Sequence, residues 1–223
     1  MQLWSKNNNK NYPDFWKEYL EHFNTQKSKR SQNEFRFVAF DTETTGFNYE
    51  EDRILSIGAV AIKKNRIDVS DQLEIYLQQT VFNEDTVEIH GIRKNSELDK
   101  ISETMALQLF LEYIGDAVLI AHHASFDRTM INKALRRQGL GDLKNRILDT
   151  AILFKNSKHF LYRTDTRKSY TLDELCNNLK ISQSDRHTAS GDAFITALAF
   201  LKITSKLKKD KKIQDIRELF VLK

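Results

Sequence analysis

The chain has 223 residues, 40% of them hydrophobic, and a formal net charge of +4 from 35 basic and 31 acidic residues. This composition suits one globular domain with an appendage and excludes a disordered chain. Its longest apolar runs, such as residues 117–121, fall short of the roughly 20 residues that cross a bilayer, so we expect a cytoplasmic protein with no membrane partner. The single cysteine, Cys176, excludes an internal disulfide and agrees with a reducing compartment. The small positive charge permits nucleic acid as a partner.

An amphipathic helix is predicted near the N-terminus, over residues 13–23. Apolar side chains recur there at i, i+1, i+4, i+5 and i+8, which is one stripe of an α-helix. The stripe consists of Phe15, Trp16, Tyr19, Leu20 and Phe23. It needs a cover, which the chain's own domain, a second copy or another protein could supply. Residues 24–33 contain no apolar residue and predict a linker, so residues 1–33 form an N-terminal helix with a linker.

The body of the chain, residues 34–205, combines strand and helix patterns. Three apolar runs with short polar breaks predict an antiparallel meander, after which strands alternate with helices. Helices on the faces of one mixed, five-stranded sheet are the simplest α/β assembly. The predicted strands cover residues 37–40, 54–62, 67–77, 117–121 and 146–148. The predicted helices cover residues 105–114, 127–138, 149–154, 172–179 and 193–201.

Two later segments are rich in lysine and arginine. Residues 155–170 interleave cations with aromatic residues, a composition that suits a surface for single-stranded nucleic acid. An ordinary solvated loop explains the same composition equally well. Residues 202–212 are also basic, but basic residues at the end of a helix complement its dipole. The basic and amphipathic tail, residues 206–223, could dock on its own chain or on a partner.

Two acids follow the first strand of the body. Alternation along a strand aims Asp41 and Glu43 toward the same side. Two unpaired carboxylates at the end of a buried strand repel each other, and a hard cation such as Mg²⁺ or Mn²⁺ relieves that repulsion. The pattern therefore indicates half of a metal site. The alternative is a simple turn that closes the strand at Asp41 and bends at Gly46.

Two further acids and a histidine repeat this anomaly. Asp127 is predicted in the first turn of a helix that Ser125 caps. Asp192 lies in a helical segment whose next residues are apolar, which directs it toward the interior, where an acid needs a partner. Gly191 beside it costs about 1 kcal/mol relative to alanine in a helix, which predicts a close backbone approach or a need for extra room there. His187 is expected at the start of this helix, leaning over the same site without binding metal.

The three places together resemble a known family. Asp41-Thr-Glu43-Thr-Thr-Gly46, His122-His-Ala-Ser-Phe-Asp127 and His187-Thr-Ala-Ser-Gly-Asp192-Ala look like the three motifs of the DnaQ-like, or DEDDh, 3′→5′ exonucleases. Flanking residues 52–60, 88–92 and 148–150 agree with the same family. The resemblance covers residues 36 to about 205. Within the family, the chain is similar to the proofreading exonucleases of the DNA polymerase III epsilon type.

The resemblance implies a ribonuclease-H-like fold and two divalent metal ions, Mg²⁺ or Mn²⁺. Carried onto this sequence, Asp41 would bridge both ions, Glu43 and Asp192 would hold the ion that binds the attacking water, and Asp127 would support the second. His187, with an unperturbed pKa near 6.5, would take the proton from that water at neutral pH.

The same resemblance implies contacts with the terminal nucleotide from Thr44, Thr45, Phe47 and His90. For Phe47, a place in the core is the alternative, and for His90 a hydrogen-bonded turn. The family's usual residues differ at two positions that bind no metal. Many relatives have Asn in place of His123 and Glu in place of Ser56, which concerns substrate detail.

The sequence thus predicts a metal-dependent 3′→5′ exonuclease that releases nucleoside 5′-monophosphates from single-stranded or frayed DNA ends. An RNA-trimming enzyme of the same fold is the first alternative. The second is a catalytically silent adaptor that docks on a polymerase through the N-terminal helix or through the tail. The complete set of acids disfavours the adaptor, because docking has no physical need for clustered carboxylates.

Overall fold

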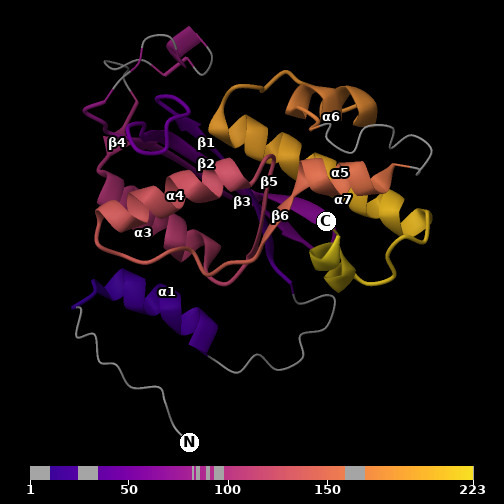
Figure 1. Ribbon diagram of the computed structural model, residues 1–223, viewed down its shortest axis with the longest axis horizontal. Coiled ribbons are helices and arrows are strands. Elements are labelled where there is room, and N and C mark those ends of the chain that lie inside the picture. Colours follow the sequence, from indigo (N-terminus) through magenta and orange to yellow (C-terminus); the bar gives the residue numbers. More distant parts are fainter. Residues whose placement is uncertain are drawn as a thin grey trace, which may run out of the picture.

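A mixed sheet of six strands organises the chain, with helices on both faces (Figure 1). The computed structural model describes residues 11–24, 35–81, 83, 86–88, 91–92, 98–158 and 169–222. The strand order is β4-β3-β2-β1-β5-β6, in which β1, β2 and β3 are antiparallel and β5 and β6 are parallel to β1 and to each other. The strands are β1 (Phe37–Thr44), β2 (Ile54–Lys63), β3 (Arg66–Leu77), β4 (Lys100–Ile101), β5 (Val118–Ala121) and β6 (Ile147–Asp149).

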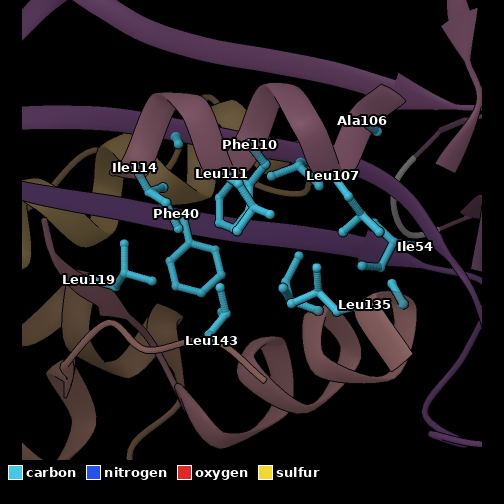
Figure 2. Close-up of a cluster of buried hydrophobic side chains, with 14 of the residues drawn as sticks. Phe40, Ile54, Ala106, Leu107, Phe110, Leu111, Ile114, Leu119, Leu135 and Leu143 are labelled. Atoms are coloured by element: carbon cyan, nitrogen blue, oxygen red, sulfur yellow. The ribbon is translucent and has the colours of Figure 1, made fainter. Parts of the chain in front are cut away.

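The central strand β1 is apolar on both faces because helices cover it from both sides. Val38 and Phe40 point into one hydrophobic cluster, and Phe37 and Ala39 point into another. Figure 2 shows the first cluster, in which Phe40 lies among side chains of two helices. This two-sided burial is why residues 37–40 read as a continuous apolar run.

Each cluster belongs to its own set of helices. The first cluster contains residues of α1, α3 and α4, and the second contains residues of α5, α6 and α7 together with the C-terminal 3₁₀ helix. The helices are α1 (Asp14–Asn24), α3 (Glu103–Ile114), α4 (Ser125–Arg137), α5 (Thr150–Ser157), α6 (Leu172–Leu179), α7 (Ala189–Lys209) and the 3₁₀ helix η2 (Ile216–Val221). The sheet thus separates two cores, and an acid on β1 faces only one of the two helix sets.

The aromatic N-terminal helix packs on its own chain. Trp16 and Tyr19 are each 2% exposed and belong to the first cluster. The Tyr19 hydroxyl donates to Asn145 Oδ1 at 2.7 Å and accepts from the Lys144 N–H at 2.7 Å. The sequence left three packing partners open for this apolar stripe: its own domain, a second copy or another protein. The structure shows it packed on its own domain.

The C-terminal tail also folds back. Ile216 and Leu219 of η2 are buried in the second cluster, and the Arg146 guanidinium lies over the Phe220 ring. The 3₁₀ helix of this tail begins with a capping box between Asp215 and Glu218.

The α/β fold with its meander and parallel strands is confirmed, and two details differ from expectation. The sheet has a sixth strand, β4, whose two residues are too few to leave a pattern in the sequence. The capping role predicted for Ser125 is wrong, because Ser125 is already helical and Ala124 takes the cap position without a side-chain bond. Among the described residues, no helix combines the length and the apolar character needed to span a membrane.

Substituting Gly58 on β2 with alanine is expected to destabilise the fold. An added Cβ would lie 2.1 Å from the Ala189 carbonyl carbon and 2.2 Å from the Ser190 nitrogen, both backbone atoms at the start of α7. Overpacking usually costs about 1–3 kcal/mol, and backbone moves less readily than a side chain. The free energy of unfolding measured in urea should therefore fall by an amount at the upper end of this range or above it. Gly139→Ala is the control: it meets open space at φ 74° and should cost only about 1 kcal/mol. Equal losses in the two variants would contradict this packing.

Candidate active site

The end of β1 carries the first two acids of the site. Alternation places Asp41 and Glu43 on the same side as Phe37 and Ala39, which is the side covered by α7. On β2, Asp41 pairs with Gly58 and Glu43 pairs with Ser56. Because glycine at position 58 has no side chain, the backbone at the start of α7 can approach this strand closely.

The start of α7 supplies the third acid. Thr188 caps the helix by accepting a hydrogen bond from the Gly191 N–H at 3.1 Å, and Asp192 follows in the first turn. A Cβ on Gly191 would lie 1.8 Å from the Asp185 carbonyl oxygen. The close backbone approach that the sequence predicted at Gly191 is therefore present, and it lets the chain turn tightly before Asp192.

These elements bring three carboxylates together. Within the described part of the chain, Asp41, Glu43 and Asp192 each offer an oxygen, and the three oxygens lie within 4.8 Å of one another. Asp192 Oδ1 is buried and has no hydrogen-bond partner among the described residues. Oxygen donors that converge in this way fit Mg²⁺ or Mn²⁺, which prefer carboxylate ligands.

Crowding of the acids disfavours their charged forms. Burial raises the pKa of Asp41 well above its usual range, and the charges of Asp127, Asp192 and Glu43 raise it further. Burial also raises the pKa of Glu43 to about 7, again with contributions from Asp192 and Asp127. A cation bound among these acids would stabilise their charged forms.

The fourth predicted acid, Asp127, lies on α4 and approaches β1 beside the cluster. Its Oδ1 accepts hydrogen bonds from the Thr42 N–H at 3.0 Å and the Thr42 hydroxyl at 2.7 Å. Burial raises its pKa to about 7, although the Thr42 hydrogen bonds oppose the rise. Asp127 is not one of the three residues with converging oxygens, but its charge acts on Asp41.

The predicted base, His187, precedes Asp192 by five residues but is not one of the three residues of the carboxylate cluster. Its side chain is exposed, and its backbone is left-handed at φ 67°. The preceding residue, Arg186, is the functional neighbour that sequence reasoning missed. Its Nη1 donates to Asp192 Oδ2, and its Nε donates to Asp173 Oδ1 at 2.7 Å. The only signal for this contact in the sequence is that a basic residue, Arg186, precedes His187.

The residues predicted to bind nucleotide differ in exposure. Thr44 and Thr45 are buried, and their hydroxyls donate to the Gly46 carbonyl at 2.8 Å and to Asp52 Oδ1 at 2.6 Å. Phe47 is 78% exposed, which excludes the core location, and its ring centroid lies 5.7 Å from that of Phe126. His90 and residues 159–168 of the basic stretch lie outside the described residues.

Two acids that the sequence did not assign support these loops. Asp52 accepts from the Thr45 hydroxyl and from the Asn48 N–H at 2.8 Å, which fixes the turn after β1. Asp149 accepts the backbone N–H groups of Ala124, in the turn before α4, at 3.0 Å and of Ala151, at the start of α5, at 2.8 Å. Turn-forming acids of this kind are common in proteins, so the sequence offered no specific signal.

The two departures from the family pattern have structural counterparts. His123 adopts φ 56°, a left-handed conformation in which asparagine and histidine are both enriched. Ser56 faces Glu43 across the β1–β2 pair, and its hydroxyl is buried without a partner among the described residues. A serine at this position adds no carboxylate to the crowded cluster.

Comparison with known proteins identifies the family. The RNase_T family model, described as "Exonuclease", matches residues 38–200, so the chain belongs to this exonuclease family. The DNA polymerase III PolC-type of Caldanaerobacter subterraneus subsp. tengcongensis is 36% identical over 176 residues, which are 78% of this chain and 12% of that protein. The PolC-type polymerase of Halalkalibacterium halodurans is 34% identical over 161 residues, which are 72% of this chain and 11% of that protein. The chain therefore spans only about a tenth of these relatives.

A solved structure with the same fold supports the ribonuclease-H-like architecture. E. coli Exonuclease I in complex with a dT13 oligonucleotide superimposes with a TM-score of 0.68 at 14% identity, covering 80% of this chain and 43% of that one. At 14% identity the likeness concerns the fold alone, and it confirms the predicted ribonuclease-H-like fold.

Removing the charge of Glu43 should make stability less dependent on pH in EDTA. The pKa of Glu43 is about 7 in the folded chain, against 4.5 for an unperturbed glutamate. The folded state therefore keeps this proton to a higher pH than the unfolded state does. Stability from this group is complete below about pH 4.5 and is lost as pH rises to about 7. Thermal unfolding should therefore show Glu43→Gln gaining stability over wild type between pH 5 and pH 8. The exposed Glu18→Gln is the control, and a constant difference for Glu43→Gln would contradict the raised pKa.

Thr42→Val should destabilise the folded chain more at pH 8 than at pH 5. It removes the hydroxyl that donates to Asp127 Oδ1, and a hydrogen bond to a charged group contributes about 1.5–3 kcal/mol. Asp127 is charged mainly above its pKa of about 7, so the loss should grow as pH rises. Urea denaturation at both pH values measures this loss, and Thr42→Ser, which keeps the hydroxyl, should resemble wild type. A Thr42→Val loss that is independent of pH would contradict the role of this bond.

Proposed function

We propose that this chain is a metal-dependent 3′→5′ exonuclease that releases nucleoside 5′-monophosphates from single-stranded or frayed DNA ends. The convergence of Asp41, Glu43 and Asp192 is the observation that carries the proposal. Membership of the exonuclease family supplies the reaction class, which is hydrolysis of a phosphodiester. The resemblance of the motifs around these acids to those of 3′→5′ exonucleases supports the proposed direction.

The acids have distinct roles in this proposal. Asp41, which the charges of the other three acids reach, would bridge two divalent ions. Glu43 and Asp192 would hold one of these ions, and Asp127 would support the other. When bound, such ions stabilise the attacking and the leaving oxygen of an in-line displacement. Asp192 Oδ1 is buried and has no partner among the described residues, which supports this assignment, because a buried carboxylate oxygen is stable only with a partner.

The remaining groups would handle the proton and the nucleotide. His187 would accept the proton of the attacking water, and its exposed ring on a loop could reach a substrate bound over the cluster. Phe47 would stack on a base, because its ring is exposed near the end of β1. Thr44 and Thr45 would position the turn that contacts the terminal nucleotide, with His90 near its sugar or base.

DNA is the preferred substrate of this proposal because the relatives are DNA polymerases. An RNA-trimming activity is the alternative that the shared fold permits. The relatives also suggest a polymerase as partner, yet the apolar stripe of α1 and the tail helix η2 pack on this chain. A partner would therefore contact the outer faces of these elements.

A nuclease assay tests the proposal. End-labelled single-stranded DNA and RNA of matched sequence would be incubated with Mn²⁺ or EDTA. Wild type should shorten DNA from its 3′ end only with Mn²⁺, and Asp41→Asn should lose at least about a thousandfold in rate, because several kcal/mol of transition-state stabilisation are removed. Asp68→Asn is the control, since Asp68 is an acid on β3 that pairs with Lys63 and Ser70. No shortening of either substrate would overturn the proposal, and faster loss of RNA would reverse the substrate preference.

A further inference from the structure

The carboxylate cluster has an ion-pair partner that the proposed reaction does not use. Arg186 bridges two helices, with Nη1 on Asp192 of α7 and Nε on Asp173 of α6. The Arg186 side chain is 15% exposed and that of Asp192 is 9% exposed, whereas Asp173 is 53% exposed. The arginine therefore joins an inner carboxylate of the site to an outer carboxylate near the surface.

The inner contact is selective for one oxygen of Asp192. Arg186 occupies Oδ2, while Oδ1 is buried and has no hydrogen-bond partner in the part of the chain that the structure describes. Within the described ranges, Arg186 is the only basic side chain that forms an ion pair with Asp41, Glu43 or Asp192. It thus supplies the positive charge that this group would otherwise lack.

We propose that Arg186 is the resident counter-ion of Asp192 and competes with the divalent ion for this carboxylate, so that it sets the metal affinity of the site. The inference rests on the proposed function in taking Asp192 as a metal ligand. An ion held by the three converging oxygens would lie next to the guanidinium, and two cations on one carboxylate repel each other. Binding of the ion would therefore weaken the contact between Arg186 and Asp192.

Asp173 explains how the arginine can yield without losing every partner. The Nε contact with Asp173 uses a different edge of the guanidinium from the Nη1 contact with Asp192. When the ion takes Asp192, Arg186 keeps one carboxylate partner at the rim of the site. The planar, several-donor guanidinium suits this double contact better than a lysine ammonium does.

Metal binding to the intact chain tests the proposal. Titration calorimetry with Mn²⁺ would compare wild type with Arg186→Gln, Arg186→Lys and the charge-matched control Arg128→Gln, an exposed residue of α4. Arg186→Gln should bind Mn²⁺ about tenfold more tightly, which corresponds to about 1.4 kcal/mol for an ion pair that need not be broken. Arg186→Lys should fall between wild type and Arg186→Gln, and Arg128→Gln should remain close to wild type.

Thermal unfolding in EDTA and in Mn²⁺ provides the second readout and shows that the variants fold. Arg186→Gln should unfold at a lower temperature than wild type in EDTA and gain more from Mn²⁺. Folded Arg186→Gln that binds Mn²⁺ as wild type does, or more weakly, would overturn the competition and indicate that Arg186 instead orients Asp192. Equal Mn²⁺ binding by wild type and Asp192→Asn would instead overturn the metal site itself, and the proposed function with it.

Discussion

Repulsion among three carboxylates on one side of β1 is the constraint that the neighbouring elements accommodate. Asp41 and Glu43 cannot separate, because strand geometry fixes them two residues apart on the same side. Asp192 is brought to them by α7, which can approach because positions 58 and 191 lack side chains. Burial, together with this repulsion, raises the pKa values of Asp41 and Glu43. Positive charge beside these carboxylates reduces their mutual repulsion, and Arg186 provides part of that charge through its ion pair with Asp192.

The two cores explain how this crowding is tolerated. The sheet places α1, α3 and α4 on one side and α5, α6 and α7 on the other, so each helix set is fixed by its own apolar cluster. Asp127 comes from the first side and Asp192 from the second, and they approach β1 from α4 and α7. The site is therefore held by packing on both faces of one central strand, and the burial of β1 supports its geometry.

The sequence predicted the parts of the fold and site that local rules govern. Alternation along β1 aligned Asp41 with Glu43, and the apolar residues after Asp192 indicated its inward direction. The contact between Arg186 and Asp173 was not predictable, because it joins residues 13 positions apart through a loop that has no periodic pattern. Ser125 was assigned as a cap from residue preference alone, whereas the turn before α4 is stabilised by Asp149. Hydrogen bonds between distant segments leave no signal in a single sequence.

Anomalous diffraction shows most directly whether the repelling carboxylates form a divalent-metal site. Crystals of the intact chain grown with Mn²⁺ would be measured near the manganese absorption edge. We expect an anomalous peak within coordination distance of Asp41, Glu43 and Asp192. A well-ordered site with no peak at these oxygens, and with the three carboxylates still clustered, would contradict it.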